Sequence, residues 1–181
     1  MKQNPYIVTF SGLRFYPLSP TKETIHIADI ARSLSQQGRF SGHTSRYYSV
    51  AQHCVLVSEL SSGRAALAGL LHDAAEAYIL DIPRPIKQLS SMSGYRKMDE
   101  AISKLIFKKY NVSFDKEIQT CVKNSDNIAL YIEAYNLMSI GSFANIERFS
   151  EYVDFILPAW SSKEAEKQFL LRFKDLIRSD R

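Results

Sequence analysis

The sequence has few cysteines and no long apolar segment, and both absences exclude classes of protein. Its 181 residues include two cysteines, Cys54 and Cys121, which stand alone in helix-like segments and form no CxxC pair. The cysteines therefore indicate neither a disulfide framework nor a thiolate zinc knuckle, and we expect two buried free thiols. No apolar run approaches the roughly 20 residues that span a bilayer, and the first residues lack the apolar region and cleavage site of a signal peptide. We therefore expect a cytoplasmic protein that does not bind membranes.

Low-complexity linkers, internal repeats and blocks of like charge are also absent from the sequence. A chain of this length with 45% hydrophobic residues suits one compact domain, which we expect to span residues 1–181. The formal charge of +4 mildly favours anionic partners such as nucleotides. Because the basic residues are interspersed with acidic and apolar ones, they form no stripe that would suggest a nucleic-acid surface.

Most of the chain has apolar residues at helical spacing, so we predict an all-α bundle. Helices are expected over 23–38, from the N-cap Ser49 to about 61–63, and over 64–78, 94–110, 114–138 and 161–178. Aromatic and β-branched residues alternate in 6–20, which indicates a small N-terminal hairpin or extended arm. In 153–160, Pro158 argues against a helix, and we expect a loop that packs Trp160 on the core.

The predicted helix over 64–78 contains three ionisable side chains among apolar neighbours. On a helix, His72, Asp73 and Glu76 would fall within an arc of about 100°, so they could converge on one point. Burying such groups is costly unless a partner compensates them. The pattern therefore predicts a bound cation or a set of paired charges at this position.

The preceding helix provides a candidate partner, His53. This histidine lies ten residues before Gly63, and His72 lies nine residues after it. If Gly63 marks the turn of a helical hairpin, both imidazoles lie about 14–15 Å from that turn, at the same level. Two imidazoles and the Asp73 carboxylate would then form a ligand set that suits Mn, Fe, Co or Zn better than Mg or Ca.

The residues His53, His72-Asp73 and Asp126, in this order, resemble the H…HD…D pattern of the HD-domain metal-dependent phosphohydrolases. The segments "YYSVAQHCVLVSEL", "LLHDAAEAYILDIPRPIK" and "KNSDNIALYIEAYNLM" look like the bacterial 5′-deoxynucleotidase branch and related phage proteins, some of which hydrolyse dATP to triphosphate. The resemblance covers roughly 12–138. It implies an HD-domain helical bundle in which His53, His72, Asp73 and Asp126 bind a divalent metal.

The same resemblance implies roles for the carboxylates that follow the HD pair. Glu76 and Asp81 would orient or deprotonate the attacking water, or protonate the leaving oxygen. The expected cofactor is Mn, Co, Zn or Fe, with Mg at a second, phosphate-bound site. A divalent ion suits this chemistry because it polarises phosphoryl oxygens and lowers the pKa of water.

The family also uses an arginine ahead of the first histidine to bind phosphate. Arg39 and Arg46 both qualify by residue type, and Arg39 is the first choice. Arg84 and Lys87 are further candidates for neutralising phosphate charge. Pro85, or its neighbour Pro83, could form a rigid wall of a base or sugar pocket.

Several residues depart from the pattern or have simpler explanations. Gln52 stands where the nucleotidase branch often has Glu before the first histidine, which puts the finer orientation of the site in question. His26 and His43 have no counterpart in the ligand pattern, and we interpret them as ordinary residues. Glu133 lies seven residues after Asp126 and is expected to be structural. No GYP signature follows His72-Asp73, which counts against a cyclic dinucleotide phosphodiesterase.

Three functions are compatible with these observations. The first is hydrolysis of a deoxynucleoside triphosphate, preferably dATP, to the deoxynucleoside and triphosphate. The second is a 5′-deoxynucleotidase that acts on deoxynucleoside monophosphates, and the third is an HD module that binds a metal or nucleotide without turnover. We favour the first. The expected setting is the cytoplasm of a bacterial cell, where the protein could be encoded by a phage. The expected assembly is a homo-oligomer. Action on nucleic-acid ends is disfavoured because the chain is short and has no basic stripe.

Overall fold

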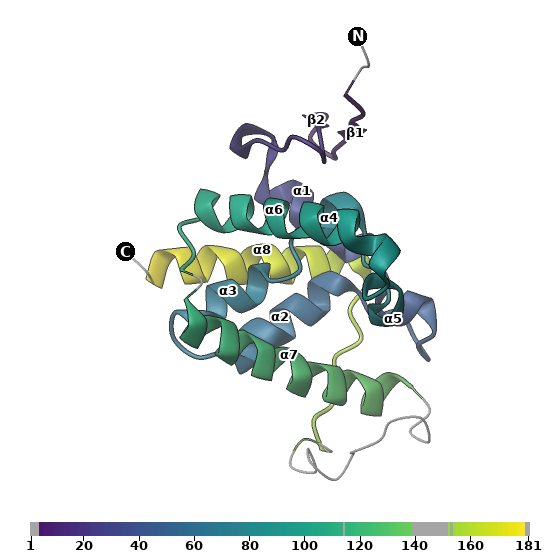
Figure 1. Cartoon of the computed structure of the whole chain (residues 1–181). Coiled ribbons are helices and arrows are strands. Elements are labelled where there is room, and N and C mark those ends of the chain that lie inside the picture. Colours follow the sequence, from purple (N-terminus) through teal and green to yellow (C-terminus); the bar gives the residue numbers. More distant parts are fainter. Residues whose placement is uncertain (1–3, 114, 139–151, 153, 180–181) are drawn as a thin grey trace.

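The computed structural model describes residues 4–113, 115–138, 152 and 154–179, which form a bundle of helices preceded by a small hairpin (Figure 1). The order is β1 (Ile7–Val8), β2 (Arg14–Phe15), α1 (Ile27–Gln36), α2 (Val50–Leu60), α3 (Ala65–Leu71), α4 (Glu76–Ile79), α5 (Arg84–Lys87), α6 (Ser93–Lys109), α7 (Lys116–Leu137) and α8 (Ser162–Ser179). Short 3₁₀ turns lie at Lys22–Thr24, Arg39–Gly42 and Ser90–Met92. The predicted all-α fold with a small N-terminal hairpin is confirmed.

The hairpin consists of two antiparallel strands in which Ile7 pairs with Phe15. The turn between the strands includes Gly12 at φ 81°, a conformation that glycine adopts without steric cost. Phe15 is fully buried and stacks on Tyr78 of α4, with 4.0 Å between the ring centroids. The hairpin is further attached to α1, because the Ser11 backbone N–H and hydroxyl donate to the two carboxylate oxygens of Asp29.

The α2–α3 pair is the predicted helical hairpin. Ser49 caps α2, since its side chain accepts from the backbone N–H of Gln52 at 3.1 Å. The chain then turns through Gly63, whose φ of 52° lies in the left-handed region. The two helices approach closely at Gly69, where a Cβ atom would lie 2.9 Å from the Ser61 Oγ and 3.2 Å from the Val57 carbonyl oxygen.

The prediction of one continuous helix over 64–78 is wrong, because α3 ends at Leu71 and α4 begins at Glu76. Between them, the N–H groups of Ala74 and Glu76 donate to carbonyls three residues back, as in a 3₁₀ turn. The Gly69 carbonyl at the end of α3 accepts from the His72 Nδ1 at 2.7 Å. This hydrogen bond lies where the α-helix changes to the 3₁₀ turn. The predicted arc of about 100° for His72, Asp73 and Glu76 assumed a continuous α-helix and therefore does not apply.

The helix predicted over 23–38 is shorter, since α1 covers Ile27–Gln36 and a separate 3₁₀ turn covers Lys22–Thr24, and the helices α2, α6, α7 and α8 lie within two residues of their predicted bounds. Helix α6 starts one residue earlier than expected, and α7 starts at Lys116 with Asp115 as its N-cap. The predicted start of that helix at residue 114 lies outside the described residues, as does Val153 in the predicted loop. The rest of that loop, 154–160, contains no helix or strand, and Trp160 packs against the core as expected.

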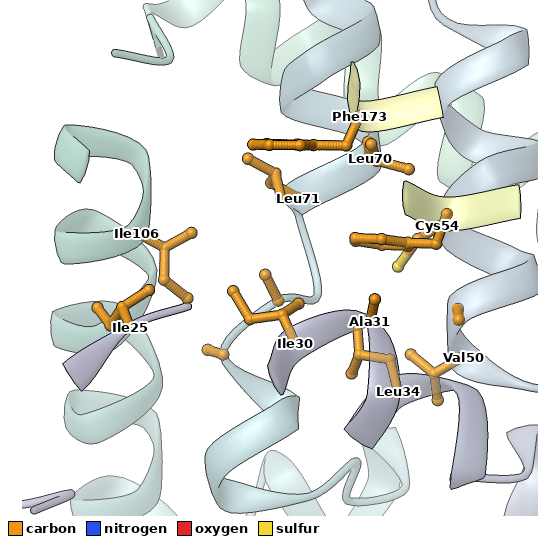
Figure 2. Close-up of a cluster of buried hydrophobic side chains, with 14 of the residues drawn as sticks. Ile25, Ile30, Ala31, Leu34, Val50, Cys54, Leu70, Leu71, Ile106 and Phe173 are labelled. Carbon is orange, nitrogen blue, oxygen red and sulfur yellow. The ribbon is translucent and has the colours of Figure 1, made fainter. Parts of the chain in front are cut away.

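The α2–α3 hairpin lies at the centre of the bundle, with buried apolar clusters on both sides. One cluster includes Ile30 of α1, Ile106 of α6 and Phe173 of α8 (Figure 2). The other packs Ile132 and neighbouring residues of α7 against the hairpin. Elements that are far apart in sequence therefore meet at α2 and α3. Among the described helices, none is both long and apolar enough to cross a membrane.

Candidate metal centre

Four predicted ligands come together between α2, α7 and the turn after α3; we refer to His53, His72, Asp73 and Asp126 as the His–Asp cluster. The Nε2 atoms of His53 and His72 are 3.3 Å apart. The Asp73 Oδ2 lies 3.1 Å from the His72 Nε2 and 3.5 Å from the His53 Nε2. The Asp126 Oδ1 also lies 3.5 Å from the His53 Nε2. The predicted meeting of the two imidazoles at one level of the helical hairpin is confirmed.

The charges in the His–Asp cluster compensate one another. Burial lowers the pKa of His72, but the adjacent Asp73 carboxylate outweighs this effect and holds the pKa well above its usual value. Burial favours the neutral form of Asp73, yet the two histidines and Arg39 hold its pKa well below the usual range. In the same way, the bond to His53 outweighs burial and lowers the pKa of Asp126. Protons on the imidazoles thus neutralise the carboxylates.

The donor atoms of the His–Asp cluster suit a metal ion. The Nδ1 atom of His53 is bonded to Glu133 and that of His72 to the Gly69 carbonyl, so both Nε2 atoms face the cluster. One ligand atom from each of His53, His72 and Asp73 lies within 4.8 Å of the others. Nitrogen and carboxylate donors in this number match the sites of divalent transition metals. This group could therefore hold a metal ion, which would replace the positive charge of the imidazole protons.

Glu76 lies next to the cluster at the start of α4, with 4% of its surface exposed. Its Oε1 accepts from the Lys87 Nζ at 3.1 Å, while its Oε2 is buried and has no hydrogen-bond partner among the described residues. Burial, together with the charges of Asp73 and Asp81, raises the pKa of Glu76 to about 9. Asp81 is half-buried, and its backbone N–H donates to the Gln37 Oε1 at 3.3 Å. Burial and these neighbouring charges therefore favour the protonated form of Glu76 when no metal ion is bound.

The predicted phosphate-binding residues occupy different places. Arg84 is 60% exposed, and its guanidinium lies 3.9 Å from the Asp126 Oδ2, at the edge of the cluster. Lys87 donates a hydrogen bond to the Oε1 of Glu76, which follows the cluster residue Asp73 by three positions. Pro85 lies in the first turn of α5 and is exposed. Arg46 instead donates to the backbone carbonyls of Leu157 and Pro158, at 2.6 and 3.0 Å.

Arg39 and Glu133 form a buried ion pair beside the cluster. The Arg39 Nη2 donates to the Glu133 Oε2 at 2.8 Å, and the Glu133 Oε1 lies 2.6 Å from the His53 Nδ1. Burial favours the neutral form of Glu133, but Arg39 and His53 outweigh it and lower the pKa of the carboxyl group. From the sequence, Glu133 is expected to be only structural. The available signal was its spacing of seven residues from Asp126, which places both on one face of α7.

Three other residues singled out in the sequence lie outside the cluster. Gln52 is buried, and its amide donates to the Pro158 carbonyl at 2.8 Å, so it anchors the 154–160 loop. His26 precedes α1 and bonds the Glu23 carbonyl, and His43 is exposed. Of the two cysteines, Cys54 is buried and Cys121 is half-buried, and both are free thiols.

The fold and the site together define an all-α protein with a buried histidine–aspartate group that could hold a metal ion. The chain is 41% identical over 173 residues to uncharacterized protein YfdR of Escherichia coli strain K12, across 94% of this chain and 95% of YfdR. It is 33% identical over 135 residues to uncharacterized protein RCAP_rcc00048 of Rhodobacter capsulatus, across 68% of each chain. The chain therefore belongs to the same family as YfdR. No family model matches the sequence.

Proposed function

We propose that the protein is a metal-dependent phosphohydrolase of the HD-domain type that acts on small deoxynucleotides. The main support is the geometry of the His–Asp cluster, whose residues resemble the H…HD…D pattern. Neighbouring donor atoms of His53, His72, Asp73 and Asp126 lie 3.1–3.5 Å apart, close enough to bind one cation together. The preferred substrate is a deoxynucleoside triphosphate, dATP first, which would yield the deoxynucleoside and triphosphate. A 5′-deoxynucleotidase would use the same ligands and is the alternative.

In this proposal the His–Asp cluster binds Mn, Co, Zn or Fe through two Nε2 atoms and two carboxylates. When bound, such an ion supplies Lewis-acid activation of the phosphoryl group and of water. Glu133 and the Gly69 carbonyl keep both Nδ1 atoms engaged, so the Nε2 atoms are oriented toward the centre of the cluster. A second ion, Mg, would accompany the phosphates of the substrate.

Glu76 is the proposed general acid. Its raised pKa, about 9, keeps a proton on the carboxyl group at neutral pH, and its unpartnered Oε2 is the atom free to hold it. Donation of this proton to the leaving oxygen would leave a carboxylate that the Lys87 ammonium stabilises from 3.1 Å. Asp81, which raises the pKa of Glu76, has a supporting electrostatic role.

Phosphate binding would come first from Arg84 and Lys87. Both are cationic side chains close to the carboxylates of the site, and Arg84 is exposed enough to reach a ligand. A triphosphate carries several negative charges, so it gains more from this basic edge than a monophosphate does. Pro85, exposed in the first turn of α5, would supply a rigid apolar contact to the sugar or base.

A homo-oligomer is also proposed. The N-terminal hairpin exposes Tyr6, Val8 and Phe10, whose burial against a second copy would be favourable. Light scattering coupled to gel filtration would measure the molecular mass. A monomer at all accessible protein concentrations would exclude this assembly.

The decisive experiment is a substrate and metal screen. The purified protein, stripped of metal and resupplied with Mn, Co, Zn or Mg, would be incubated with each dNTP, NTP and dNMP, and the products separated chromatographically. We expect deoxynucleoside and triphosphate from dATP. Nucleoside and phosphate from monophosphates would identify a 5′-deoxynucleotidase instead, and no product with a firmly bound metal would identify a binding module.

Variants separate the roles of the site residues in this assay. His72→Ala and Asp73→Ala should lose both metal content and hydrolysis. Glu76→Gln should keep the metal and lose about 10²–10⁴-fold in rate, the usual contribution of a general acid. The matched control is Glu166→Gln, which alters a carboxylate of α8 that pairs with Arg32 of α1, and it should retain full activity. A fully active Glu76→Gln variant would refute the acid role.

A further inference from the structure

Arg39 is presented by a strained turn that follows α1. The next two residues, Phe40 and Ser41, both have φ of 53°, in the left-handed region that side chains with a Cβ rarely adopt. The turn is fixed at its base, where Arg39 N–H donates to the Tyr48 carbonyl at 2.9 Å and Gly38 bridges to Ser49. Unfavourable backbone conformations persist where the surrounding structure enforces them, and they are frequent at functional sites.

The strained turn directs the Arg39 guanidinium inward, to Glu133. The contact joins residues 94 positions apart, at 2.8 Å, and the side chains are 13% and 0% exposed. A guanidinium removed from water in this way requires a compensating charge. Glu133 supplies it through one carboxylate oxygen, while the buried Arg39 Nε has no hydrogen-bond partner among the described residues.

Glu133, held by Arg39, also forms a hydrogen bond with His53. Its second oxygen lies 2.6 Å from the His53 Nδ1, and both side chains are fully buried. A carboxylate can only accept, so the hydrogen must lie on Nδ1. When a metal ion replaces the other imidazole proton, the lone pair is on Nε2, the atom that lies 3.3–3.5 Å from His72, Asp73 and Asp126.

We infer that Arg39 and Glu133 are positioning residues of the metal site: Arg39 fixes Glu133, and Glu133 fixes the tautomer and ring orientation of His53. This inference rests on the proposed metal-dependent function and deepens it. It also gives Arg39 a role different from the phosphate binding that the resemblance implies. A positioning residue affects metal affinity even when no substrate is present, whereas a phosphate-binding residue affects only the binding of substrate.

The test is the metal affinity of the intact protein without substrate, measured by competition with a chelating dye for Mn, Co and Zn. Glu133→Gln should weaken binding by about 10–100-fold, the usual effect of removing such a partner. Arg39→Met should weaken it in the same direction, and Arg39→Lys should restore most of the loss because it keeps the positive charge. The matched controls are Arg32→Met and Glu166→Gln, an ion pair at 3.0 Å on α1 and α8, and their affinity should equal that of the wild type.

The possible results are distinct. Folded Arg39→Met protein with wild-type metal affinity and a raised KM would make Arg39 a phosphate ligand and overturn the inference. Unchanged affinity in folded Glu133→Gln protein would overturn it equally. If the wild type binds metal as predicted but hydrolyses no nucleotide, the proposed function fails while the positioning role stands. If the wild type binds none of the metals, both fail.

A measurement on the wild type avoids variants that do not fold. Long-range ¹H–¹⁵N spectra of the zinc-loaded protein distinguish the two imidazole tautomers. The inference requires a hydrogen on the His53 Nδ1 and a metal-bound Nε2. A hydrogen on Nε2 would overturn it, whatever the variants do.

Discussion

Glu76 links the chemistry of the site to the pH dependence of stability. Its pKa of about 9 in the folded protein exceeds the ordinary value of 4.5, so between these values the folded state binds a proton that the unfolded state has lost. Stability should therefore fall as the pH rises from about 4.5 to 9, by up to about 1.4 kcal/mol per pH unit for one proton.

Urea denaturation of metal-free protein across this pH range would measure the effect. The Glu76→Gln variant keeps the size of the side chain and cannot titrate, so its stability should decline less steeply than that of the wild type. Parallel curves for the two proteins would show that Glu76 does not hold a raised pKa.

At the scale of single residues, the sequence was sufficient for the His–Asp cluster but not for its surroundings. His53 and His72 could be placed at one level because only the helical rise and the Gly63 turn were needed. The contact of Glu133 with His53 depends on how α7 lies across α2, which no local pattern specifies. The same holds for Arg46, whose partners are carbonyls more than a hundred positions away.

At the scale of elements, the close packing of α2 and α3 depends on Gly69. Gly69→Ala would place a methyl group 2.9 Å from the Ser61 Oγ and 3.2 Å from the Val57 carbonyl oxygen. We expect a loss of about 1–3 kcal/mol, as for other overpacked positions. Because the Gly69 carbonyl also orients His72, metal affinity should fall as well.

Gly94 provides the matched control for this substitution. It lies near the start of α6, where, apart from the adjoining backbone of that helix, no atom of the described residues lies within 4 Å of an added Cβ, so Gly94→Ala should be neutral or stabilise by up to about 1 kcal/mol. Chemical denaturation of both variants would give the two free energies. Equal effects at Gly69 and Gly94 would mean that close packing at Gly69 is not required.

Most element boundaries could be predicted because they depend on local signals. Ser49 caps α2, and Pro158 lies in a loop, as the residue types indicate. The break after Leu71 was missed, since the apolar spacing of 64–78 is uniform and nothing in it marks the bond between the His72 side chain and the Gly69 carbonyl. That bond joins residues only three positions apart, but it depends on the rotamer of the His72 side chain, which the pattern of residue types does not specify.

At the scale of the whole molecule, metal binding should stabilise the fold. Ligands of the cluster come from α2, the turn after α3, and α7, so an ion binds the folded state and not the separated elements. A metal at about 100 times its Kd would add about 2.7 kcal/mol, which corresponds to roughly 5–10 °C in Tm for a chain of this size.

Thermal unfolding with and without added Mn, Co or Zn would test this expectation. The wild type should shift, and Asp73→Ala should not, because it lacks one ligand of the group. An equal rise in Tm in both proteins would show that the ion binds at a site other than the His–Asp cluster.

The long separation between the partners of His53 also affects how the protein is made. His53 and Glu133 are 80 positions apart, and Arg39 precedes Glu133 by 94. A nascent chain that has released only α1 to α6 from the ribosome holds two histidines and one aspartate of the cluster, without the residues of α7. Such a chain lacks Asp126 and the Glu133 contact to the His53 Nδ1, so the four-ligand site with an oriented His53 forms only after α7 has been synthesised and has docked on α2.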